Sequence, residues 1–315
     1  MVRWRSDQYQ KFRVRHYLQE KMKENQKQPL AEVFGHIPTD LSEKAERYRA
    51  RKLCPFNNKV PSCTKDKAKD PLGVCSINYK GAPVITCPIR FREDWLIADH
   101  AADFFFHRKA SWTSLTEVRL VDYHGKSAGN IDVVLVAYDE NGKVYDFGVL
   151  EIQAVYISGN VRAPFMYYMS NRKGGAEMDW TGQPNFPRPD FLSSSRKRLA
   201  PQLMFKGGIL SAWNKKIAVA LDGKFFQTLP RMREVDKSDA EIAWIVHDLN
   251  LSAEQSRYEL QRTRVVYTKF HDALRIITRP RVGDVEKFVA LLQEKIDAKL
   301  EFPPENETVE NPFGV

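Results

Sequence analysis

Two acidic residues lie inside apolar, β-branched segments of this chain. Asp132 interrupts the apolar run 131–136, and Glu151 ends another apolar stretch nineteen residues later. Asn141-Gly142 between them is typical of a hairpin turn, so the two acids are expected on neighbouring strands. Carboxylates buried side by side repel each other unless a cation neutralises them. The sequence therefore predicts a divalent metal ion bound by Asp132 and Glu151.

A glutamine completes the pattern. Gln153 is two residues after Glu151, so the two side chains share one face of a strand. Gln153 can orient a water molecule or a ligand, and the backbone carbonyl of Ile152 is a further candidate metal ligand. The pattern resembles the PD-(D/E)xK nuclease core, with Gln153 where most members carry Lys. The alternative interpretation is an exposed strand end.

Length and composition set the broad class. The chain has 315 residues and 43% hydrophobic residues, enough for one large domain with elaborations or two smaller ones. Its net charge is +9 and its pI about 9.2, which favours nucleic acid as a partner over an ordinary basic protein. The sequence contains no apolar run of the ~18 residues that span a membrane and no signal-peptide core near Met1. We therefore expect a cytoplasmic protein without disulfides.

Four cysteines gather in one short segment, separated by spacings of 9, 12 and 12 residues: Cys54, Cys63, Cys75 and Cys87. These spacings differ from the paired knuckles of zinc ribbons. Four clustered thiols in a reducing compartment nevertheless favour a tetrahedral sulfur site for zinc or iron. The segment has few large apolar residues, so a metal would help it to fold. The alternative is four unrelated buried thiols.

The chain divides into four predicted regions. They are an N-terminal basic helical arm with a helix over 6–27, a four-cysteine metal-binding region, a catalytic core, and a flexible acidic tail, at residues 1–50, 51–90, 91–302 and 303–315. Hydrophobic periodicity within the core predicts helices over 93–108, 193–213, 270–278 and 283–299. It predicts strands over 114–123, 129–138, 144–156, 217–221, 242–246 and 257–267, the first three as a meander.

The segment 157–191 is rich in Gly, Pro, Asn and Arg and is expected to be irregular. A long loop directly after catalytic strands is usually functional, so we assign DNA recognition to it. Arginine or lysine can read guanine in the major groove. The candidate DNA-binding residues are Arg162, Arg172, Lys173 and Arg188.

The order of cysteines, acids and the Gly148–Gln153 string resembles the NotI-type restriction endonucleases, from about residue 34 to residue 245. The resemblance implies an α/β fold with a PD-(D/E)xK restriction-endonuclease-like core, a central mixed sheet flanked by helices, and an inserted four-cysteine region. It implies one structural iron on the four cysteines, with catalytic residues at Asp132, Glu151 and Gln153. A family glutamate fifteen residues before the aspartate matches Glu117.

The resemblance also implies the activity. The expected function is type II, Mg²⁺-dependent cleavage of a GC-rich palindrome in double-stranded DNA by a homodimer. Two alternatives remain at this point: a repair or defence nuclease with an iron–sulfur cluster, and a non-catalytic DNA-binding protein held together by a metal.

Overall fold

The computed structural model describes residues 27–67, 69–252, 257–280 and 282–301. The chain divides into two compact units, residues 1–278 and 279–315. The predicted helix over 6–27 lies, except for its last residue, outside the described residues, and so does the predicted tail from 303. In the described part of the chain, no helix is long and apolar enough to cross a membrane.

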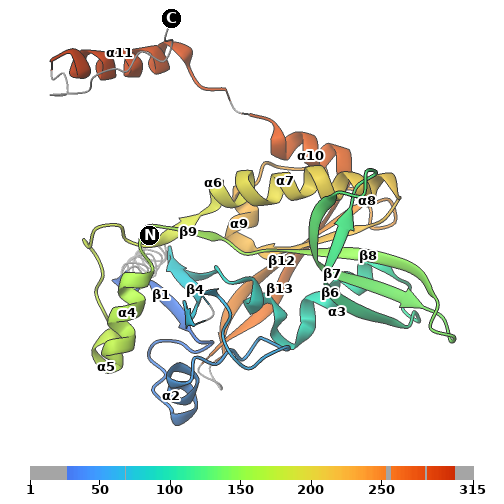
Figure 1. Ribbon diagram of the computed structural model, residues 1–315, viewed down its shortest axis with the longest axis horizontal. Coiled ribbons are helices and arrows are strands. Elements are labelled where there is room, and N and C mark those ends of the chain that lie inside the picture. Colours follow the sequence, from blue (N-terminus) through green and yellow to red (C-terminus); the bar gives the residue numbers. More distant parts are fainter. Residues whose placement is uncertain (1–26, 68, 253–256, 281, 302–315) are drawn as a thin grey trace, which may run out of the picture. The chain divides into compact units, whose positions relative to one another are not determined.

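The described part of the first unit contains a six-stranded mixed sheet (Figure 1). Its strand order is β13-β12-β11-β8-β7-β6, with bounds Arg257–Thr268, Ile242–Ser252, Ile217–Asp222, Val144–Gln153, Ser127–Tyr138 and Trp112–Val121. Strand β11 pairs in parallel with both β8 and β12, and the other neighbours are antiparallel. The predicted strands and the β6-β7-β8 meander are confirmed.

The β7–β8 hairpin turns where the sequence predicts it. Gly142 has a φ of 77°, a conformation that glycine adopts readily. The carboxylate of Asp139 accepts hydrogen bonds from the backbone nitrogens of Asn141 and Lys143, both at 2.9 Å. This turn sets a register in which Val133 lies opposite Leu150. Continuing that register by one residue brings Asp132 opposite Glu151.

Helices cover both faces of the sheet. On one face, Val149 and Val219 pack against Leu199 and Leu203 of the helical segment 191–212. On the other face, Leu150 and Ala218 pack in a cluster with residues of helix α3 (Leu96–Phe105). A β-carbon at Gly148 would lie 2.3 Å from the ring of Phe105, so only glycine allows α3 to approach β8 this closely. Helix α3 corresponds to the predicted helix 93–108. It is preceded by a 3-10 turn, η1 (Pro88–Trp95), which overlaps the first residues of the predicted range.

The predicted helix 193–213 is a succession of α and π turns. Its elements are α6, η2, α7, η3 and α8, with bounds Phe191–Ser193, Ser194–Leu199, Ala200–Gln202, Leu203–Gly207 and Gly208–Ala212. The π turns η2 and η3 flank Pro201, whose missing N–H cannot join the ordinary α-helical pattern. Turns of this kind inside helices often occur at functional sites.

Two strands of the cysteine region and one strand that precedes it build a second, smaller sheet. Strands β1 (Leu30–Val33), β4 (Val74–Tyr79) and β5 (Ala82–Ile85) are antiparallel. They stand beside helix α2 (Glu43–Ala50) and the β2–β3 pair (Asp66–Lys67 and Asp70–Pro71).

The segment 157–191, expected to be irregular, instead contains defined elements. They are the β9–β10 pair (Tyr156–Ser158 and Arg188–Asp190) and helices α4 (Arg162–Ser170) and α5 (Arg172–Ala176). Phe165 and Tyr168 of α4 pack in the core of the cysteine region, where the Tyr168 hydroxyl donates to the Pro38 carbonyl at 2.9 Å. Burial of these aromatic side chains gives the segment a fixed structure that its composition does not indicate.

The described part of the first unit also contains the helices α9 (Gly223–Thr228) and α10 (Phe270–Thr278). The bounds of α10 match the predicted 270–278. The second unit contains α11 (Val285–Glu301), close to the predicted 283–299.

Candidate active site

The two acids meet on adjacent strands, as the sequence predicts. Asp132 on β7 accepts a hydrogen bond from the backbone nitrogen of Ile152 on β8, at 2.8 Å from Oδ2. Glu151 is only 4% exposed, whereas Asp132 is half-buried. The sheet register and this hydrogen bond hold the two carboxylates side by side on the face covered by the segment 191–212.

A lysine that the sequence reasoning missed occupies this site. Lys206 of η3 places its Nζ 2.9 Å from both Oε1 and Oε2 of Glu151. Lys206 is 6% exposed, so this is a buried ion pair. The Lys206 side chain passes Gly129, whose φ of 105° is a conformation that favours glycine.

Gln153 is buried next to the acids. Its Nε2 donates to Oε1 of Gln202 on α7, while its own Oε1 is buried without a hydrogen-bond partner within the described residues. The Ile152 carbonyl accepts from Nη2 of the half-buried Arg198 at 3.3 Å. Glu151, Gln153, Gln202 and Lys206 line one cavity together. A buried oxygen without a partner can accept a hydrogen bond from a water molecule beside it.

Glu117 lies on the other side of Asp132. On β6, Thr116 pairs with Val133 and Val118 with Ile131, so Glu117 stands opposite Asp132. Its side chain is exposed and its φ is 61°, in the left-handed region that non-glycine residues avoid. Strain of this kind is common at functional sites. The strand pairing thus brings all three predicted acids to neighbouring positions.

Burial dominates the electrostatics of Glu151. It raises the pKa of this carboxyl from 4.5 to about 7, and the neighbouring charge of Asp132 acts in the same direction. Lys206 and Arg198 lower the pKa but only partly offset the burial. The site therefore favours additional positive charge. Among the described residues, no three His, Cys, Asp or Glu side chains are arranged to hold a metal ion by themselves.

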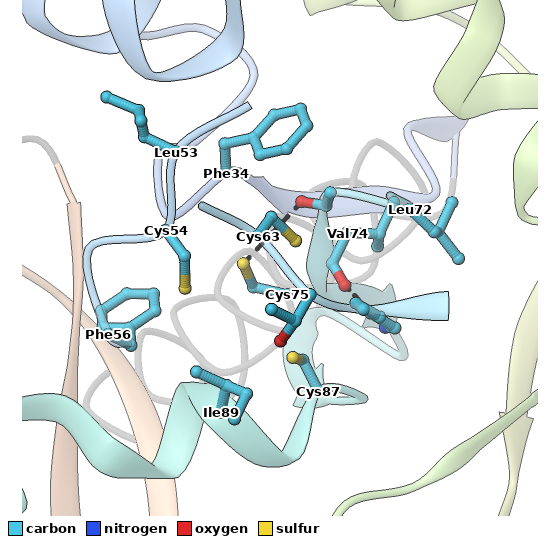
Figure 2. A pocket seen from close by; sticks show the side chains of 13 residues that line it. Phe34, Leu53, Cys54, Phe56, Cys63, Leu72, Val74, Cys75, Cys87 and Ile89 are labelled. Carbon is cyan, nitrogen blue, oxygen red and sulfur yellow. Dashed lines mark hydrogen bonds between the residues drawn. The ribbon is translucent and has the colours of Figure 1, made fainter. Parts of the chain in front are cut away.

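The four cysteines converge on a different cavity. Figure 2 shows Cys54, Cys63, Cys75 and Cys87 around a common space lined by apolar side chains such as Phe34 and Ile89. All four thiols are free. Burial raises the pKa of Cys54 to about 12 and also raises the pKa of Cys63 and Cys75, so these thiols stay protonated at neutral pH. In the described structure no three of these thiols are placed to hold a metal ion as they stand. An all-sulfur donor set would nevertheless suit a soft or borderline metal ion, whose binding would release the protons.

Two of the four DNA-binding candidates already have acidic partners. Arg162 contacts Asp66 and Asp70 at 2.6 and 2.8 Å, and Arg172 contacts Glu46 at 3.0 Å. These ion pairs join α4 to the β2–β3 pair and α5 to α2. Lys173 and Arg188 are exposed, and neither makes an ion pair within the described ranges. Arg196 and Lys197 are also exposed, on the same helical segment as Lys206.

One sequence signal would have identified Lys206. Leu199, Leu203 and Leu210 form the apolar stripe of the helical segment that faces the sheet. Lys206 falls in that stripe, at spacings of three and four residues from its neighbours. A charge at a core-facing position indicates a buried partner. Gln202 and Arg198 carry no comparable signal, because their direction depends on the π turns.

Adjacent carboxylates on a mixed sheet, in a chain of net charge +9, define a candidate nuclease site. A model of the family described as Restriction endonuclease NotI matches residues 39–260. That range covers most of the chain, which therefore belongs to the NotI restriction endonuclease family and is a type II site-specific deoxyribonuclease. A search of curated proteins found no match. The predicted family is confirmed.

The pKa of Glu151 generates a prediction for stability in Mg²⁺-free buffer. The pKa of Glu151 in the folded protein is about 7, above the ordinary 4.5, so the folded state binds its proton more tightly than the unfolded state does. The stability that this difference contributes is fully present below pH 4.5. It is lost as the pH rises through 7. The side chain of Glu151→Gln cannot ionise. As the pH rises from 4.5 to 8, the free energy of unfolding of this variant should therefore increase, relative to that of the wild type, by on the order of 3 kcal/mol. Urea denaturation at several pH values measures this difference. Glu140→Gln at the exposed hairpin turn is the control, and a pH-independent difference for Glu151→Gln would contradict the assignment.

Proposed function

We propose that this enzyme cuts both strands of a GC-rich palindromic DNA site, depends on Mg²⁺, and uses a PD-(D/E)xK core. The observation that carries the proposal is the juxtaposition of Asp132 and Glu151 on adjacent strands. Membership of the NotI family supports DNA as the substrate. The net charge of +9 supports a polyanionic partner.

In this proposal, Asp132, Glu151 and the carbonyl of Ile152 hold Mg²⁺. Two carboxylates are sufficient, because Mg²⁺ usually keeps several waters and binds substrate phosphate as well. The bound ion would lower the pKa of a water molecule and stabilise charge on the scissile phosphate. The free Oε1 of Gln153 would accept a hydrogen bond from the attacking water and orient it. Glu117, opposite Asp132, would contribute to a second ion site.

DNA contacts would come from the exposed basic residues, Lys173, Arg188, Arg196 and Lys197. Arg162 and Arg172 would reach DNA only by leaving their acidic partners, so in this proposal they support the fold. A palindromic site matches a two-fold symmetric enzyme, so we propose a homodimer with one active site for each strand. We place the activity in the cytoplasm.

We also infer that Cys54, Cys63, Cys75 and Cys87 bind one structural iron, in an inserted four-cysteine region. Their convergence on one cavity supports this inference. Zinc would fit the same four thiolates. The distance in sequence between Cys54 and Cys87 suggests that the ion joins β4, η1 and the preceding loops into one unit.

Removal of either acid should abolish cleavage. Asp132→Ala and Glu151→Ala should each lower single-turnover cleavage of a cognate site by about 10³-fold or more, because each removes a ligand of the ion. Specific binding should remain, since neither residue reads bases. The site itself is found first by digesting a random plasmid library with Mg²⁺ and sequencing the ends. Glu140→Ala is the control. Normal cleavage by either acid variant would show that the active site is elsewhere.

The cysteine inference predicts one metal ion per chain. Cys54→Ser should lose most of this metal and unfold at a lower temperature, whereas Ser62→Ala, an exposed neighbour, should retain both properties. Elemental analysis and thermal denaturation measure the two effects. Acid-labile sulfide should be absent, which separates a single ion from an iron–sulfur cluster. Metal-free wild-type protein that folds and cuts normally would disprove the inference.

A further inference from the structure

Lys206 occupies a position on the helical segment 191–212 at which the neighbouring core-facing residues are apolar. Leu199 and Leu203 precede it, and Leu210 follows it, on the stripe that packs against the sheet. The stem of Lys206 passes Gly129, and its ammonium contacts both oxygens of Glu151 at 2.9 Å. The ammonium lies equally far from the two carboxylate oxygens. A cation bound by Glu151 would take the same position.

Stability alone does not account for this lysine. A buried ion pair costs desolvation of both charges, and a pair of apolar residues of similar volume is often equally stable or more stable. Here the lysine neutralises one of two adjacent carboxylates, Asp132 and Glu151, that would otherwise repel each other. The charge of Lys206 therefore offsets the repulsion between the two acids and is not needed for packing of the core.

The same helical segment makes a second contact with the site. Gln202, four residues before Lys206, accepts a hydrogen bond from Nε2 of Gln153. This contact holds the amide of Gln153, a residue that lines the cavity and whose Oε1 is buried without a hydrogen-bond partner among the described residues. The π turns on either side of Pro201 determine which side chains of the segment face the sheet. Three residues of one irregular stretch of helix, Arg198, Gln202 and Lys206, thus make polar contacts with β8.

We propose that Lys206 is a positioning residue that holds the place of the divalent ion in the metal-free enzyme. It orients the Glu151 carboxylate by contacting both of its oxygens, and it leaves Glu151 when the ion binds. This inference rests on the proposed function, because it takes Asp132 and Glu151 as the ligands of the ion. Lys206 and the ion compete for one carboxylate, so the lysine weakens metal binding while keeping the empty site folded.

Mn²⁺ binding measured by electron paramagnetic resonance tests this competition. Lys206→Met and Lys206→Gln remove the competing charge and should bind Mn²⁺ at least about tenfold more tightly than the wild type. Lys206→Arg keeps the charge and should bind as the wild type does. Lys215→Met is the control, because Lys215 pairs with Asp146 at 2.7 Å and contacts neither acid. Unchanged or weaker binding by both neutral variants would overturn the proposal.

Two further measurements make the outcome unambiguous. Asp132→Ala should weaken Mn²⁺ binding; if it does not, the proposed metal site is wrong, whatever Lys206 does. If neither neutral variant folds, crystals of the wild type with and without Mn²⁺ decide the question. The Lys206 ammonium should then move out of hydrogen-bonding distance of Glu151 when Mn²⁺ is present. An ammonium that stays on Glu151 beside bound Mn²⁺ would overturn the proposal.

Discussion

The buried ion pair between Lys206 and Glu151 is the contact on which the arrangement of the candidate site depends. The hairpin register places two carboxylates side by side, and their mutual repulsion has to be offset by positive charge. Lys206 supplies that charge from the helical segment 191–212. The ion pair thereby joins the helical segment to the sheet. Two neighbouring contacts do the same: Gln153 donates to Gln202, and Arg198 donates to the Ile152 carbonyl.

A second buried charge network ties the cysteine region to the sheet. Arg90 contacts Glu32 of β1 and Glu93 of η1, both at 2.9 Å, and the Glu93 carboxylate accepts a hydrogen bond from the backbone nitrogen of Leu260 on β13 at 2.6 Å. The Arg90 guanidinium also lies 4.1 Å from the ring centroid of Phe56, which lines the cysteine cavity. The cysteine cavity is therefore connected to the edge of the central sheet through Arg90.

Sequence signals predicted the elements whose structure depends on residues that are neighbours in the chain. Alternating apolar residues and Asn141-Gly142 indicated the β7–β8 hairpin, and hence the meeting of Asp132 with Glu151. Features that depend on distant partners were not predictable in this way. The composition of 157–191 indicates a loop, yet burial of Phe165 and Tyr168 against the cysteine region orders it. The acidic partners of Arg162 come from a strand pair nearly a hundred residues away.

The central claim is that Asp132 and Glu151 hold the divalent ion that contacts the scissile phosphate. The most direct measurement is a crystal structure of the enzyme with its cognate DNA and Ca²⁺, an ion of similar ligand preference. The account predicts one ion within about 2.3–2.6 Å of oxygens from both carboxylates and from one DNA phosphate. DNA bound with its phosphates away from these acids, or an ion that contacts neither of them, would contradict it.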